Sequence, residues 1–171
     1  EIFLYDGSTT TQLTDNYYSD LNPKINSKGH VVWQGNDGNW EIFLYDGSTT
    51  TNLSNNHYDD RGPDINDNGY VVWVTDNPNI DYAPIYVYNG LTTVEAAKNY
   101  EKFYASSFSR FHHMININGQ VVWAGHRSLE FVTDTTLEIF LATLSDTKDV
   151  PDKKDSSLEN MPWIPLLLLD D

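Results

Sequence analysis

Histidine and acidic side chains are the residues of this sequence that could bind a metal ion. His112 and His113 are adjacent and could combine with His57 or His126. Neighbouring residues of an extended strand point to opposite faces, which disfavours a zinc site built from this pair. Asp-rich turns such as Asn36–Gly38 could supply oxygen ligands, yet none matches the twelve-residue calcium loop that ends in glutamate. We therefore expect no cofactor, with a structural Ca²⁺ ion as the alternative.

The sequence contains none of the common catalytic motifs. It has no glycine-rich phosphate loop, no G-x-S-x-G nucleophile turn and no H-E-x-x-H zinc helix. The absence of cysteine excludes disulfides, thiolate nucleophiles and cysteine-bound zinc. The 25 Asp and Glu residues make neighbouring carboxylates common by chance, so a pair of acids does not indicate a glycosidase. We predict that the protein is not an enzyme.

Composition favours one folded domain with an acidic surface. The 171 residues are 39% apolar and 13% aromatic, which suits a packed core rich in strands. The net charge of −15 would be repelled by nucleic acids and by anionic membrane surfaces, so neither partner is expected. No stretch approaches the ~20 apolar residues that a membrane-spanning helix needs. The first residue, Glu1, lies within a repeated phrase, which we interpret as a cleaved leader or a fragment of a longer chain.

A thirteen-residue phrase occurs twice and predicts a repeat architecture. EIFLYDGSTTTQL begins at Glu1, and EIFLYDGSTTTNL begins at Glu41. The triplet Val-Val-Trp recurs with its tryptophan at positions 33, 73 and 123, in steps of 40 and then 50 residues. Each unit consists of short apolar or alternating segments separated by Asn-Gly, Asp-Gly and similar turns. This arrangement is typical of an antiparallel meander.

The repeat predicts an all-β fold. A four-stranded meander cannot bury both of its faces alone, and radial stacking of such sheets forms a β-propeller. We predict a propeller-like array of about three and a half four-stranded antiparallel blades, with repeats at about residues 1–20, 21–55, 62–95 and 111–146. The predicted inter-blade core consists of Trp33, Trp73, Trp123, Phe3, Phe43 and Phe140. A sugar-stacking platform is the alternative role of the tryptophans.

The repeat resembles the TolB-like, WD-type β-propeller family. The shared pattern is D-x-x-P-x-I-N-x-x-G-x-V-V-W followed by E-I-F-L-Y-D-G-x-T-T, over roughly residues 1–146. The residues that carry it are Asp20, Pro23, Gly29, Trp33, Asp46 and Gly47, then Asp60, Pro63, Gly69, Trp73, Asn89 and Gly90. The third unit departs from the pattern, with Arg110 and His113 at two of its positions. The resemblance implies a secreted or periplasmic location and protein–protein interaction without catalysis.

The predicted strands do not add up to a closed ring. Two strands precede two complete units and about three follow them, whereas closed propellers have four to eight blades. Unpaired sheet edges at both ends invite pairing with another strand. A polar linker, residues 147–160, leads to the apolar segment 161–171, whose run of leucines is typical of a strand buried on both faces. The predicted assembly strand comprises Trp163, Ile164, Leu166, Leu167, Leu168 and Leu169.

The assembly strand has two predicted destinations. It either folds back onto a blade of its own chain or inserts into a neighbouring molecule as a donated strand. Residues 91–110 interrupt the repeat, and we expect a short helix or structured loop there, with Thr92 or Thr93 as its cap. This insertion either fills a gap between units or docks a partner. Its candidate docking residues are Tyr100, Phe103, Tyr104 and Phe108.

These observations together predict a structural role. We expect a non-catalytic, secreted or cell-surface protein that assembles with itself into an extracellular filament or tube through β-strand contacts. The alternative is a monomeric periplasmic or cell-surface propeller module that binds a protein or a glycan.

Overall fold

The fold consists of strands throughout the part of the chain that the structure describes. The computed structural model describes residues 1–80, 83–96, 113–126 and 137–143. In these ranges every regular element is a β-strand, and the strands form four antiparallel sheets. This confirms the predicted all-β class.

Each sheet is formed by strands that follow one another along the sequence. Sheet A contains β1 (Phe3–Tyr5) and β2 (Thr10–Gln12). Sheet B contains β3 (Asp20–Ile25), β4 (Val31–Asn36), β5 (Trp40–Tyr45) and β6 (Thr50–Asn52). Sheet C contains β7 (Asp59–Ile65), β8 (Val71–Asp76), β9 (Ile85–Tyr88) and β10 (Thr93–Glu95). Sheet D contains β11 (His113–Ile115), β12 (Gln120–His126) and β13 (Leu137–Thr143).

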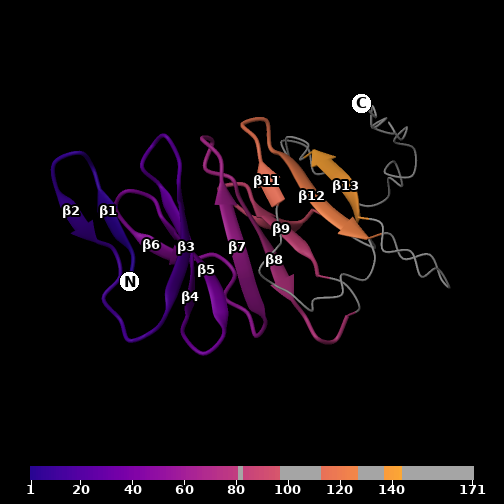
Figure 1. The fold of residues 1–171 in the computed structure, drawn as a ribbon, viewed down its shortest axis with the longest axis horizontal. Helices are drawn as coiled ribbons and strands as arrows, with labels where there is room; N and C mark the ends of the chain where they lie inside the picture. The colour runs from indigo at the N-terminus through magenta and orange to yellow at the C-terminus, as the bar shows by residue number, and fades with distance from the viewer. Residues whose placement is uncertain (81–82, 97–112, 127–136, 144–171) are drawn as a thin grey trace, which may run out of the picture.

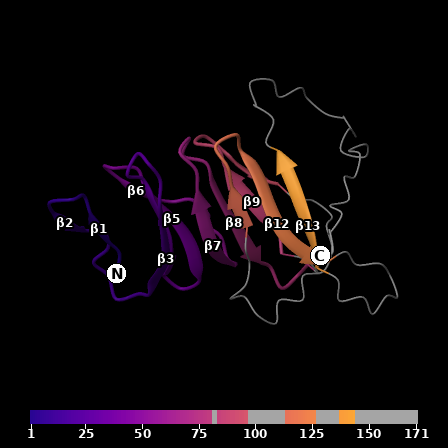
Figure 2. The same ribbon diagram turned by 45° about the horizontal axis from the view of Figure 1, so that its top comes forward.

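The four sheets lie one behind another along the length of the molecule. Figures 1 and 2 show sheet A at one end, sheet D at the other, and sheets B and C between them. Strand β7 contacts β3, β4 and β5 of sheet B, and β11 contacts β7 and β8 of sheet C. Each sheet therefore packs against the next sheet in the sequence.

Local turn chemistry explains why these segments form hairpins. In the first turn of each repeat an asparagine carbonyl accepts the N–H of a glycine three residues later, as from Gly29 to Asn26 at 3.1 Å and from Gly69 to Asn66 at 3.0 Å. Both glycines have positive φ (80° and 86°), which a side chain would disfavour. The second type of turn is held by Asp46, whose Oδ1 accepts main-chain N–H groups two and three residues later at 2.8 Å. These bonds hold the pKa of Asp46 well below its ordinary value.

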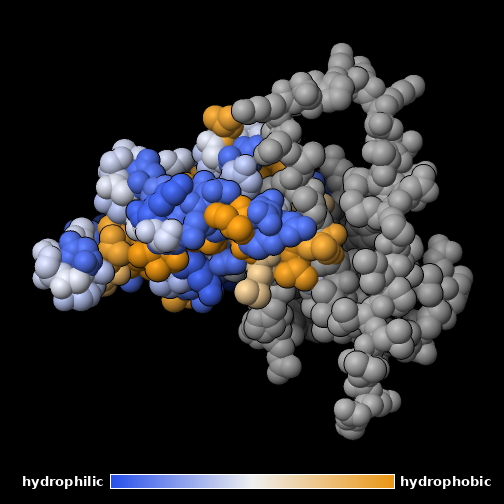
Figure 3. Space-filling model, turned by 90° about the horizontal axis from the view of Figure 1, so that it is seen from above, coloured by the Kyte–Doolittle hydropathy of each residue, from blue (hydrophilic) through white to orange (hydrophobic). Residues whose placement is uncertain are grey.

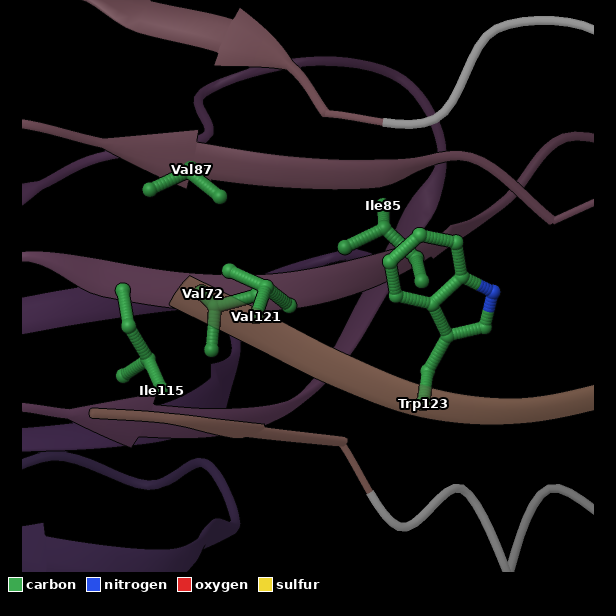
Figure 4. Close-up of a cluster of buried hydrophobic side chains, with 6 residues drawn as sticks. All are labelled: Val72, Ile85, Val87, Ile115, Val121 and Trp123. Carbon is green, nitrogen blue, oxygen red and sulfur yellow. The ribbon is translucent and has the colours of Figure 1, made fainter. Parts of the chain in front are cut away.

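The core lies between the sheets and consists of three apolar clusters. The cluster between sheets A and B contains Ile2, Val31 and Trp33, and the cluster between B and C contains Val32, Ile42, Ile65, Val71 and Trp73. The third cluster joins sheets C and D and is drawn in Figure 4, where Val72, Ile85 and Val87 face Ile115, Val121 and Trp123. Alternate residues of one strand enter different clusters, because successive side chains point to opposite faces. The second strands of sheets B and C, β4 and β8, are consequently buried over nearly their whole length.

Phe3 corrects the prediction of a uniform inter-blade core. The side chain of Phe3 is 59% exposed, whereas its repeat equivalent Phe43 stacks on Trp33 at 5.8 Å between sheets A and B. The neighbours of Phe3, Ile2 and Leu4, pack towards sheet B, so Phe3 points away from it. No sheet covers that side of sheet A among the described residues.

The start of the insertion also differs from the prediction. Thr93 caps no helix, because Thr93–Glu95 forms β10 and pairs with β9. The cross-strand pairing with Tyr86–Tyr88 outweighs the local helix propensity of the following residues. The rest of the insertion, the linker and the assembly strand lie outside the described residues, as does the side chain of Phe140.

The surface of the described part mixes hydrophilic and apolar residues. In the view from above, apolar side chains reach the surface at several places between hydrophilic ones (Figure 3). Among the described residues, no helix has the length and apolar character needed to cross a membrane.

Candidate functional site

The same side-chain contacts recur at successive junctions between sheets. The residues at which each series of contacts begins and ends can therefore be identified. We call the side of a sheet that faces the preceding sheet its front face and the opposite side its rear face. Ile65, on the front of sheet C, packs in one cluster with Val32, on the rear of sheet B. Ile115, on the front of sheet D, packs in one cluster with Val72, on the rear of sheet C. An isoleucine on a valine therefore recurs at each of these two junctions.

The equivalent residues on the front of sheet B and on the rear of sheet D are incompletely covered. Ile25, on the front of sheet B, is 58% exposed, while Ile65 and Ile115 are each 8% exposed. Val122, on the rear of sheet D, is half-buried, while Val32 and Val72 are fully buried. Among the described residues, Ile25 and Val122 are thus the two members of the isoleucine–valine series without a partner.

A row of asparagines joins the same junctions through hydrogen bonds. Asn26 donates from Nδ2 to the carbonyl of Asn66 at 3.0 Å, and Asn66 donates from Nδ2 to the carbonyl of Asn116 at 2.8 Å. In each of the three residues Oδ1 accepts two main-chain N–H groups of its own turn. We call Asn26, Asn66 and Asn116 the asparagine ladder. It sets the register of one sheet on the next.

The asparagine ladder also ends where the isoleucine–valine series ends. Asn116 donates from Nδ2 to Oε1 of Gln120 in its own repeat, at 2.8 Å, in place of a following sheet. The carbonyl of Asn26 accepts the N–H of Gly29, and among the described residues no side-chain amide reaches it from a preceding repeat. Both contact series therefore stop at the front of sheet B and at sheet D.

Replacing Asn66 with alanine should destabilise the fold by about 2–3 kcal/mol, since about 1 kcal/mol is expected for each lost hydrogen bond. The substitution removes the 2.8 Å bond to Asn116 and two 2.9 Å bonds within its own turn. Asn68→Ala is the matched control, because Asn68 makes one exposed side-chain bond, to the carbonyl of Ile117. Urea unfolding of both variants checks the prediction. Equal losses of stability would contradict a special role of the ladder.

A buried carboxylate lies behind the tryptophan of sheet C. Asp60 is fully buried and accepts hydrogen bonds from Nε1 of Trp73 at 3.0 Å and from Nδ2 of Asn56 at 2.7 Å. The hydroxyl of Thr75 is a third donor to this carboxylate. Burial raises the pKa of Asp60 to about 6, and the nearby carboxylate of Glu41 adds to this effect. The bonds from Thr75 and Asn56 oppose it.

Sheet B contains a reduced version of this network. Asp20 occupies the position of Asp60 and accepts a bond from Nδ2 of Asn16 at 3.0 Å. Gly35 stands where sheet C has Thr75, and a Cβ atom at Gly35 would lie 2.6 Å from Oδ1 of Asp20. Nε1 of Trp33 is buried without a hydrogen-bond partner among the described residues. The complete network is therefore particular to sheet C in the described part of the chain.

The stability of the protein should depend on pH through Asp60. Its pKa is about 6 in the folded protein and about 3.9 in an unfolded chain, so the folded state binds a proton more tightly. The resulting stabilisation is fully present below about pH 4 and is lost as the pH rises through about 6, a change of up to about 3 kcal/mol. Urea unfolding between pH 4 and 7 measures it. Asp60→Asn should remove this slope, and an unchanged slope in that variant would contradict the assignment.

Metal ligands are not gathered anywhere in the described part of the chain. Within it, no group of three or more histidine or acidic side chains has the geometry to hold a metal ion. Of the histidines considered for zinc, His113 lies in β11 and His126 in β12, and His113 pairs across the strands with Trp123. His112 lies outside the described residues.

The structure brings together some of the residues singled out in the sequence. Trp33, Trp73 and Trp123 each lie in a different inter-sheet cluster, and Phe43 packs with the first of them. The sequence reasoning missed the asparagine ladder and the Asp60 network. The signal for the ladder was the recurrent Ile-Asn before each turn glycine, at positions 26, 66 and 116.

Comparison with known proteins adds no relative to these observations. No family model, no curated protein and no solved structure matches the chain.

Proposed function

We propose that this protein is a non-catalytic structural subunit that assembles with its own copies through β-strand contacts, in an extracellular filament or tube. The observation that carries the proposal is the exposure of Ile25 on the front of sheet B, which the two-stranded sheet A leaves uncovered, while Ile65 and Ile115 are buried at the same position of later sheets. The same isoleucine position is covered between the later sheets and uncovered in sheet B. A further sheet from another copy could cover it in the same way. A contact between different surfaces of identical subunits need not close, and so it produces fibres.

The finer description of the fold belongs to the same proposal. We infer a propeller-like twist of the stacked sheets and membership of the TolB-like, WD-type repeat group, supported by the repeat pattern in the sequence. A secreted or surface location is consistent with the net charge of −15. In this proposal the assembly strand, residues 161–171, pairs with a neighbouring subunit.

Deleting residues 161–171 should abolish or strongly weaken assembly. Burial of several large apolar side chains would be lost, at about 1.5–3 kcal/mol each before entropy. Multi-angle light scattering over a concentration series should show particles larger than the 19.5 kDa monomer for the full chain and a monomer for the deletion. Substituting serine at Asp170 and Asp171 is the matched control and should leave assembly intact. Unchanged assembly of the deletion variant would remove the assembly strand from the proposal.

The second candidate is a monomeric module that binds a protein or glycan. The observation that favours it is a pair of exposed aromatic rings before β3, with Tyr17 fully exposed and Tyr18 56% exposed. Exposed tyrosines suit stacking on sugar rings or peptide planes. A particle mass that stays at one chain over the whole concentration series would favour this candidate.

A further inference from the structure

The front of sheet B and the rear of sheet D carry residues that match each other in the same way as the residues at the junctions inside the chain. Inside the chain, each isoleucine on a front face meets a valine on the rear face of the preceding sheet. Among the described residues, the members without a partner are Ile25 on the front of sheet B and Val122 on the rear of sheet D. The asparagine ladder ends at the same two sheets, because the carbonyl of Asn26 and the side-chain amide of Asn116 bond only within their own repeats among the described residues. A single contact between the rear of sheet D and the front of sheet B would complete both the isoleucine–valine series and the asparagine ladder.

Strand β1 already has the sequence needed to stand beside β12. Glu-Ile-Phe-Leu occurs at residues 1–4 in and before β1, at residues 41–44 in β5, and at residues 138–141 in β13. In sheet B the leucine of this motif, Leu44, pairs with Val32. In sheet D the leucine at 141 pairs with Val122. Leu4 is therefore equivalent to the residue that faces Val122.

The outer edge of β1 is open in the described structure, since β1 pairs only with β2 there. The exposed side chain of Ile25 lies in β3, where Ile25 pairs with Val31 of the buried cluster between sheets A and B. Strand β12 of the same chain lies at the far end of the stack (Figures 1 and 2). A second copy of the chain is therefore the occupant that would fit the open edge of β1 and the exposed Ile25.

We propose that the β11–β12 hairpin of one copy docks in front of β3 of a second copy, and that β1 of the second copy replaces β13 beside β12. The exchange preserves the ladder, because β1 and β13 present the same Glu-Ile-Phe-Leu sequence to β12. It places Leu4 opposite Val122, packs Val122 on Ile25, and brings Asn116 to the carbonyl of Asn26. It also adds β2 as a fourth strand, giving sheet D the strand number of sheets B and C.

This inference rests on the proposed self-assembly and specifies its contact surface. Because the two surfaces differ, each copy keeps one free end after docking, and the assembly grows head to tail. The contact is formed by described residues only, and the pairing of residues 161–171 with a neighbouring subunit is a separate contact in the same assembly. Its failure can therefore be distinguished from the failure of assembly as such.

A reversible disulfide between β12 and β13 tests the exchange. The chain has no cysteine, so Val122→Cys with Leu141→Cys introduces a single possible bridge at paired positions. Oxidation locks β13 in place and should lower the amount of assembled protein at least about tenfold, as expected when a large apolar contact is lost. Reduction should raise assembly again, and comparing the two redox states of one variant removes the effect of the cysteine at Val122 from the comparison. Val32→Cys with Leu44→Cys is the matched control in sheet B and should assemble equally well in both redox states.

A second variant tests the docking surface without cysteines. Ile25→Asp changes a side chain that is 58% exposed, so the single chain should fold normally while assembly falls at least about tenfold. Leu91→Asp, at a residue 89% exposed, adds the same charge away from the contact and should assemble like the wild type. Circular dichroism confirms folding, and sedimentation velocity measures assembly.

The outcomes separate the two levels of the proposal. Loss of assembly on oxidation and in Ile25→Asp supports the exchange. Normal assembly of the oxidised Val122/Leu141 variant, or of Ile25→Asp, overturns it and leaves the proposed function standing. A wild-type chain that stays monomeric at all concentrations overturns both.

Discussion

Replacing Asp60 with alanine is expected to lower the free energy of unfolding at pH 5, below the pKa of about 6 that Asp60 has in the folded protein, by about 3–5 kcal/mol, the largest effect that we predict for a polar residue. The carboxylate is fully buried and is the common acceptor for Trp73, Thr75 and Asn56. Its removal leaves buried donors without a partner, and each such donor costs about 1–3 kcal/mol. Thermal or urea unfolding of the variant measures the loss.

Asp20→Ala is the matched control for this prediction. Asp20 stands at the equivalent position of sheet B, where Gly35 replaces the threonine and Asn16 donates a side-chain hydrogen bond at 3.0 Å. Its loss should cost about 1 kcal/mol. If the two alanine variants were equally stable, the network of sheet C would have no special energetic role. Asp60→Asn should fall between wild type and alanine, since it retains one acceptor oxygen.

Replacing Trp73 with alanine should cost about 3–5 kcal/mol and bring the domain close to unfolding. Trp73 is 1% exposed, lies in the cluster between sheets B and C, and stacks on Tyr86 at 6.1 Å. The substitution leaves a large cavity at the junction and also removes a donor to Asp60. Intrinsic fluorescence and urea unfolding would report the effect.

Phenylalanine substitutions divide the contribution of this tryptophan into packing and hydrogen bonding. Trp73→Phe keeps an aromatic ring but loses the 3.0 Å bond to Asp60, so we expect a loss of about 1–3 kcal/mol. Trp33→Phe should cost less, because Nε1 of Trp33 has no partner among the described residues. A larger loss for Trp33→Phe than for Trp73→Phe would contradict the hydrogen-bond assignment.

Much of the fold was predictable because both the turn residues and the apolar strand residues recur in each repeat. The tryptophans of Val-Val-Trp are predicted in the core, and Trp33 and Trp73 are each 1% exposed. The antiparallel meander followed from the spacing of the turns, and sheets B and C show it. Period-two alternation alone could not reveal which sheet covers which residue. For this reason Phe3 was expected in the core although it is exposed.

Of the two features that sequence reasoning missed, the asparagine ladder spans 40 and 50 residues, and the Asp60 network spans up to 15. Asn66 looks like an ordinary turn residue, and only the packed sheets show that its amide reaches Asn116. Asp60 looks like one acid among 25 in a chain of net charge −15. Its burial follows from the position of β7 behind Trp73, which no local pattern encodes. Hydrogen bonds between residues of neighbouring sheets can be recognised only once the packing of those sheets is known.

The spacing of the asparagine ladder has a consequence for how such a chain can change in evolution. Each rung joins one repeat to its immediate neighbour, so a sheet interacts with the units beside it and with no distant part of the described chain. An in-frame duplication of forty codons would insert a complete unit whose two junctions already match the existing ones. The near-identical phrases at Glu1 and Glu41 are what such an event would leave behind. Gene length, rather than the design of new interfaces, then becomes the variable that sets the size of the protein.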